Sequence, residues 1–126
     1  MIYYGSIDGI HGNPKAPAYS ASRGGLIPIT HIMAYLLGPE GTRVNYIAGA
    51  AISPTGHDLP KPLRTLHNTA EQIRATPLGR SATPEDMASV AVFLACEDSA
   101  YVTGAVVTAD GGRTTITPGT GVWYDD

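Results

Sequence analysis

Three short β-type segments, separated by stretches long enough to hold a helix, most constrain what this chain can fold into. They cover residues 1–4 (MIYY), 43–48 (RVNYIA) and 102–109 (VTGAVVTA). Strands that alternate with helices form a parallel sheet with right-handed crossover connections. The sequence therefore predicts an α/β domain with a three-strand parallel sheet, in which the near-continuous apolar run of the first strand is typical of a strand buried on both faces.

Two helices have clear sequence signals. Apolar residues recur at helical spacing from Ala18 to Leu37. Pro28 cannot donate a hydrogen bond to the carbonyl of Gly24, so we predict a kink there. Thr83, followed by a proline and two acidic residues, predicts the N-cap of another helix. The expected buried face of that helix comprises Met87, Val90, Ala91 and Leu94.

The remaining segments are rich in glycine and proline, which favours irregular structure. We predict loops over 5–17 and 49–62, with a weak helix over 63–75. The loop over 49–62 is long for a compact domain, and loops of this length are usually lids or binding segments. The domain is expected to span 1–112, followed by an irregular tail over 113–126.

Charge and cysteine content exclude several function classes. The net charge of −3, with scattered basic residues, argues against nucleic acid or an anionic membrane as partner. No apolar run approaches the ~20 residues that span a bilayer. The single cysteine, Cys96, suits a reducing compartment and is expected to be a small packing residue, so we expect a cytoplasmic protein. We expect no metal site, because no ligand spacing relates His11, His31, His57 and His67.

Tyr19 and Arg23 are the residues best placed to carry chemistry. They lie four positions apart near the start of the predicted helix, so their side chains share a face. A free phenol has a pKa of about 10, and a nearby cation would lower it towards the working range of an acid/base. Ser6, after the first strand, could hydrogen-bond a substrate oxygen. Taken alone, a tyrosine and an arginine at this spacing are most often part of an exposed helix turn without function.

The segment 19–26 (YSASRGGL) resembles the Tyr-x-x-x-Lys segment of the short-chain dehydrogenase/reductase family, with arginine in place of lysine. Further segments that resemble the family follow in its order: 43–47 (RVNYI), 77–80 (PLGR), 84–88 (PEDMA), 93–95 (FLA), 101–107 (YVTGAVV) and 110–112 (DGG). The Ser6-to-Tyr19 spacing also fits the family. The resemblance covers residues 1 to about 112 and implies a Rossmann-like sheet, here its C-terminal three-strand portion with crossover helices.

The resemblance also implies roles for four residues. Tyr19 would be the general acid/base, Ser6 would polarise the substrate oxygen, and Arg23 would take the place of the lysine that assists the tyrosine and binds the nicotinamide ribose. The backbone of Ile52 would contact the nicotinamide carboxamide. The implied activity is NAD- or NADP-dependent interconversion of an alcohol and a carbonyl, with a small-molecule alcohol or ketone as substrate and with homo-oligomers.

The sequence departs from the family in ways that bear on this function. The Thr-Gly-x-x-x-Gly-x-Gly loop that holds the cofactor's phosphates does not occur in it, so we expect the C-terminal half of an enzyme that associates with a missing N-terminal half. Arg23 replaces lysine, Gly49-Ala50 replaces Pro-Gly, and Pro54 replaces a threonine. The alternative is a non-catalytic remnant or interaction module that associates with a full-length relative.

Overall fold

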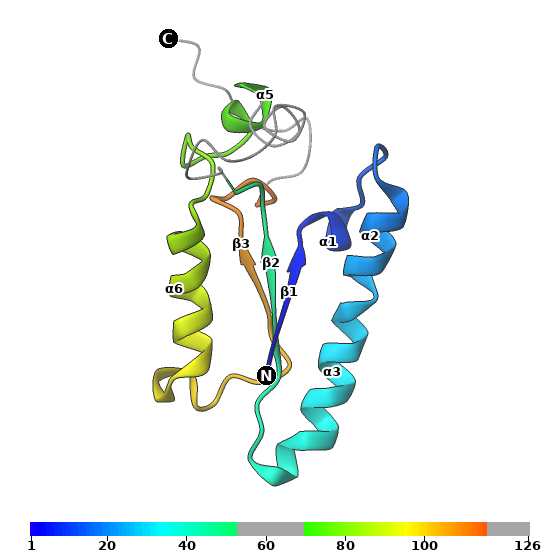
Figure 1. The fold of residues 1–126 in the computed structure, drawn as a ribbon, viewed down its shortest axis with the longest axis vertical. Coiled ribbons are helices and arrows are strands. Elements are labelled where there is room, and N and C mark those ends of the chain that lie inside the picture. The colour runs from blue at the N-terminus through cyan, green and yellow to red at the C-terminus, as the bar shows by residue number, and fades with distance from the viewer. Residues whose placement is uncertain (53–69, 116–126) are drawn as a thin grey trace.

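The fold is a three-strand parallel sheet with helices on both faces (Figure 1). The computed structural model describes residues 1–52 and 70–115. The strands are β1 (Ile2–Ser6), β2 (Asn45–Gly49) and β3 (Val106–Ala109), in the spatial order β1-β2-β3. The predicted α/β architecture is confirmed. Both strand pairs are parallel, as crossover connections require.

Strand β2 is the centre of the core. All five of its residues are buried, because the sheet is covered on both faces. Strand β1 lies at the edge of this sheet, and Tyr4 is half-exposed, so the predicted burial on both faces is wrong there.

The first helical region differs from the prediction in two ways. The segment 5–17 was expected to be a loop, but it contains the short helix α1 (Asp8–His11). The predicted single helix is divided at Gly25 into α2 (Pro17–Gly24) and α3 (Leu26–Leu37). The division falls in the turn before Pro28, whose missing N–H removes a bond in that turn. Gly25 keeps helical backbone angles, so α3 continues from α2 (Figure 1).

Helix α6 (Pro84–Ala95) begins as the sequence predicts. The Thr83 side chain accepts the Asp86 N–H, and the Asp86 carboxylate accepts the Thr83 N–H, which forms a capping box. Met87 and Leu94 are buried against the sheet, while Val90 and Ala91 are half-buried. The half-buried Cys96 at the helix end donates its thiol hydrogen to the Phe93 carbonyl.

The third strand is shorter than predicted. Residues 102–105 precede β3 and are not part of it, because Gly104 takes a positive φ of 70° and the Thr103 hydroxyl bonds the Val44 N–H. Helix α5 (Ala70–Arg74) covers the end of the weak helix predicted over 63–75, and the rest of that prediction lies outside the described residues. The carboxyl ends of the strands point to the same end of the molecule as α5 (Figure 1).

Candidate functional site

Ser6 is the last residue of β1 and is buried. Its Oγ accepts a hydrogen bond of 3.1 Å from the backbone N–H of Asp8, the first residue of α1. The hydroxyl is therefore an acceptor in this contact, and its own hydrogen makes no bond within the described residues. It remains available as a donor towards a ligand.

Tyr19 and Arg23 lie on α2 and share a face, as predicted. The Arg23 guanidinium carbon lies 5.0 Å from the centre of the Tyr19 ring, which is within cation–π range. Arg23 Nη1 also donates to the Tyr4 carbonyl of β1 at 3.4 Å. Tyr19 itself is 43% exposed. The guanidinium thus links the exposed phenol to the strand that carries Ser6.

The Nε atom of Arg23 has an unusual environment. It is buried and has no hydrogen-bond partner within the part of the chain that the structure describes. A buried donor without an acceptor is costly, and such a group in a folded protein calls for an explanation such as a ligand. Beside Tyr19, Arg23 therefore has one donor that is satisfied, Nη1, and one that lacks an acceptor, Nε.

Two tyrosines that the sequence reasoning missed complete this region. Tyr4 lies in β1, and burial and then the neighbouring Tyr19 raise the pKa of its hydroxyl above the ordinary value. Tyr46 lies in β2 and is fully buried, and its hydroxyl accepts the Ser6 N–H at 3.0 Å. The available sequence signal was a bulky aromatic residue in the second strand and Gly5 directly before Ser6.

Ile52 lies three residues beyond β2 and forms an isolated parallel bridge with Ala82. The Ala82 N–H bonds the Ala51 carbonyl. In a parallel bridge the residues that flank the central one make the hydrogen bonds, so the N–H and C=O of Ile52 point away from Ala82. The backbone of Ile52 therefore presents a donor and an acceptor at the carboxyl end of the sheet.

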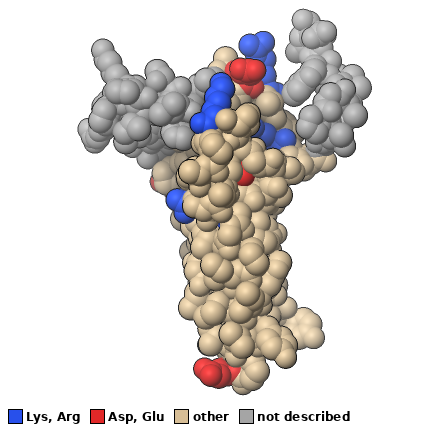
Figure 2. All heavy atoms as spheres, turned by 90° about the vertical axis from the view of Figure 1, so that its right-hand side faces the viewer, with Lys and Arg blue, Asp and Glu red and all other residues tan. Residues whose placement is uncertain are grey.

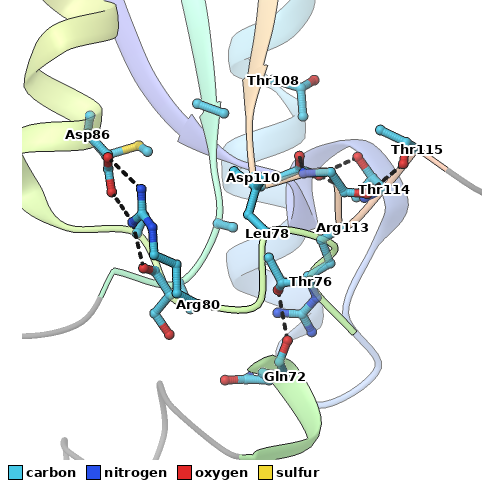
Figure 3. Close-up of a pocket in the computed structure, with 18 of the residues that line it drawn as sticks. Gln72, Thr76, Leu78, Arg80, Asp86, Thr108, Asp110, Arg113, Thr114 and Thr115 are labelled. Atoms are coloured by element: carbon cyan, nitrogen blue, oxygen red, sulfur yellow. Dashed lines mark hydrogen bonds and ion pairs between the residues drawn. The ribbon is translucent and has the colours of Figure 1, made fainter. Parts of the chain in front are cut away.

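A cavity of about 560 Å³ lies at the carboxyl ends of β2 and β3. None of the four predicted site residues lines it. Arg80 and Asp86 form a two-bonded ion pair on one side, with Arg80 Nη2 3.0 Å from Asp86 Oδ1 (Figure 3). This pair holds the pKa of the Asp86 carboxyl well below its usual range.

On the other side of the cavity, Asp110 is buried and is satisfied by its own turn. Its carboxylate accepts from the N–H of Gly112 and from both the N–H and the hydroxyl of Thr114 (Figure 3). The Leu78 N–H bonds the Gly111 carbonyl at 3.1 Å. Two segments far apart in the sequence, 77–80 and 110–112, are therefore packed together to form the cavity wall.

Two other kinds of functional feature do not occur among the described residues. Within residues 1–52 and 70–115, no group of three or more histidine, cysteine or acidic side chains could hold a metal ion. His57 and His67 lie outside these ranges. No helix in the same part of the chain is long and apolar enough to cross a bilayer.

Comparison with known proteins places this geometry in context. A family model described as Enoyl-(Acyl carrier protein) reductase matches residues 1–114. The chain is 40% identical over 113 residues to 3-oxoacyl-(acyl-carrier-protein) reductase FabG of Thermotoga maritima, covering 89% of this chain and 44% of that protein. It is 34% identical over 123 residues to Inactive 2-(S)-hydroxypropyl-CoM dehydrogenase 2 of Xanthobacter autotrophicus, covering 92% of this chain and 51% of that protein.

The fold is similar to solved oxidoreductase structures, of which this chain again covers less than half. An oxidoreductase of the short chain dehydrogenase/reductase family from Burkholderia thailandensis superposes with a TM-score of 0.78 at 30% identity, over 92% of this chain and 44% of that one. A putative oxidoreductase from Escherichia coli K-12 gives a TM-score of 0.74, also at 30% identity, over 93% and 42%. The chain spans about half the length of the curated relatives it matches.

Proposed function

Because this chain belongs to the short-chain dehydrogenase/reductase family, we propose that it acts in the nicotinamide-dependent interconversion of an alcohol and a carbonyl, with Tyr19 as general acid/base. The observation that carries the proposal is the position of Arg23. Its guanidinium lies 5.0 Å from the centre of the Tyr19 ring and bonds β1 two residues before Ser6. Arg23 thereby connects Tyr19 to strand β1, whose last residue is Ser6.

Each side chain has a defined task in this proposal. For reduction, the Tyr19 hydroxyl gives its proton to the substrate oxygen, and Arg23 is the charge placed to stabilise the oxygen anion left on Tyr19. The Ser6 hydroxyl donates to the same substrate oxygen and polarises the carbonyl, since its oxygen already accepts from Asp8. For oxidation the proton moves in the opposite direction.

The described residues fit a nicotinamide cofactor, NAD or NADP, on two observations. The buried Nε of Arg23 lacks an acceptor, which a ribose hydroxyl would supply. The N–H and C=O of Ile52 point away from their neighbouring segment, which suits a carboxamide. The cofactor, when bound, supplies the hydride. Tyr19, Arg23 and Ile52 would hold it outside the carboxyl ends of the strands, where open α/β sheets bind ligands.

Cofactor binding is the first test of this proposal. The purified chain is titrated with NADH and with NADPH while the fluorescence of the reduced nicotinamide is followed. We expect saturation with at least one of them at or below about millimolar concentration, and weaker binding by Arg23→Met. Lys15→Met, which removes an exposed charge outside the site, is the control. If neither cofactor binds in this range, this chain does not act as an oxidoreductase by itself.

A second candidate function is supported by the surface of α3. The sequence of α3 has no acidic residue, lysine or arginine, and Figure 2 shows few charged side chains over the lower half of this side of the molecule, where α3 lies. Its exposed apolar residues are Ile29, Ile32, Tyr35 and Leu36. Apolar side chains gathered on one helix face are typical of protein interfaces. The chain would then associate with a second copy or with a full-length relative through α3.

Native mass spectrometry of the chain, alone and mixed with a full-length family member, tests this second function. Association that is lost in Ile32→Glu, on the exposed face of α3, is the expected result. Val92→Glu, an equally exposed apolar residue on α6, should have no effect. A chain that stays monomeric in both samples would rule the second function out.

A further inference from the structure

The outer edge of β1 has hydrogen-bonding groups that no strand of the described chain pairs. Met1 and Ile7 bond β2 through the Asn45 N–H and the Gly49 carbonyl. Backbone groups of a parallel strand point alternately to its two sides, so those of Ile2, Tyr4 and Ser6 point away from β2. Two side chains take up part of this edge: Arg23 bonds the Tyr4 carbonyl, and Tyr46 bonds Ser6.

Tyr46 contacts both polar groups of the Ser6 backbone. Its hydroxyl accepts the Ser6 N–H at 3.0 Å and lies 3.3 Å from the Ser6 carbonyl. The same hydroxyl lies 3.1 Å from the carbonyl of Arg23 on α2, which is the closer acceptor for its single hydrogen. One oxygen atom thus joins the end of β1 to the helix that carries Tyr19. The whole side chain is buried, with 0% exposure.

Gly5 makes this arrangement possible. The Tyr46 ring crosses β1 over Gly5, so that a Cβ atom at residue 5 would lie only 2.0 Å from the ring carbon Cζ and closer still to the hydroxyl. No residue other than glycine leaves room for that path. The ring also packs in the core cluster with Ile7 and Ala48, which limits its own movement. The hydroxyl is therefore held at a defined point between strand and helix.

On these contacts we propose that Tyr46 is a positioning residue, whose hydroxyl holds Ser6 and the Tyr19–Arg23 turn of α2 in register. The inference rests on the proposed function. Tyr46 touches no reacting atom. It acts by fixing the two backbone segments from which the proposed catalytic side chains project, and small displacements of such groups reduce the rate of catalysis.

The test is Tyr46→Phe, which removes the hydroxyl and keeps the buried ring. Amide hydrogen exchange of Ser6 should become roughly tenfold faster, because its N–H loses its acceptor. The 13C signal of Tyr19 Cζ should shift, because the α2 turn loses its link to β1. Tyr3→Phe is the matched control: Tyr3 packs against the same core, and its hydroxyl makes no bond within the described ranges. It should leave both signals unchanged.

The kinetic measurement follows reduced-nicotinamide oxidation with a 3-oxoacyl thioester as probe. Tyr46→Phe should lower kcat by about tenfold with little change in KM, since orientation rather than binding is lost. An unchanged Ser6 exchange rate, an unmoved Tyr19 signal, or an unchanged kcat would each overturn the proposal. If the wild-type chain has no activity, the proposed function fails, and the exchange and 13C measurements still decide whether Tyr46 holds the two segments together.

Discussion

The end of β1 and the cavity beside β3 both contain polar side chains, but the two regions satisfy them differently. Around the cavity, Arg80 is paired with Asp86, and Asp110 receives three hydrogen bonds from its own turn. At the end of β1, Arg23 keeps a buried donor without an acceptor, and the Ser6 hydroxyl has a hydrogen to give. The polar groups of Arg80, Asp86 and Asp110 at the cavity are therefore satisfied within the protein, whereas those of Ser6 and Arg23 at the end of β1 are available to a ligand.

The largest expected effect is the loss of activity in Tyr19→Phe, and without that loss the end of β1 would not be the reactive region. Tyr19→Phe removes the proposed acid/base and should lower kcat/KM for carbonyl reduction by about 10²- to 10⁴-fold. Affinity for the reduced cofactor should change much less, because the ring and Arg23 remain. Steady-state kinetics and a cofactor titration check the two parts. Tyr35→Phe, on the exposed face of α3, serves as control, and a fully active Tyr19→Phe would remove the assigned role.

Gly111→Ala tests whether the cavity wall is structural. Gly111 has a φ of 65°, and a Cβ there would lie 2.7 Å from Thr76 Cγ2. We expect a loss of about 2–3 kcal/mol in the free energy of unfolding, measured by urea denaturation. Gly79→Ala is the matched control, because Gly79 has a φ of 68° and open space around it. It should cost only the backbone part, ~1 kcal/mol. Equal losses would show that the close packing contributes nothing.

At the end of β1, the variants Arg23→Lys and Arg23→Met separate the effect of the positive charge from that of the guanidinium shape. Arg23 stands where the family has lysine, and its hydrogen bond to the Tyr4 carbonyl is long, at 3.4 Å. We therefore expect the positive charge of Arg23 to matter more than its planar fork. Arg23→Lys should keep kcat/KM within a few-fold, whereas Arg23→Met should lose about tenfold or more. Equal activity of the two variants would show that the positive charge has no role.

The smallest expected effect concerns Asp86. Its pKa is lowered in the folded chain, first by Arg80, so its contribution to stability is present above the unfolded pKa of about 4 and is lost as the pH falls below it. Asp86→Asn should therefore lower the urea midpoint at neutral pH, and the difference from wild type should shrink in acid. A difference that does not depend on pH would contradict this assignment of the ion pair.

Part of the site could be predicted because it depends on spacing along one helix. Tyr19 and Arg23 lie four residues apart on α2, and the structure brings their side chains together. Tyr4 and Tyr46 could not be found in that way. Tyr46 reaches Ser6 only because β1 and β2 are neighbours and Gly5 leaves space above the strand. Such contacts join residues about 40 positions apart, which no local pattern relates.

By itself, the sequence determined the parallel α/β architecture, the helix N-cap at Thr83 and the shared face of Tyr19 and Arg23, because these follow from local periodicity and backbone chemistry. Only the tertiary structure decided which polar groups are satisfied. Whether a buried donor such as Arg23 Nε has an acceptor depends on every element packed around it, and that packing brings together groups that are distant along the chain.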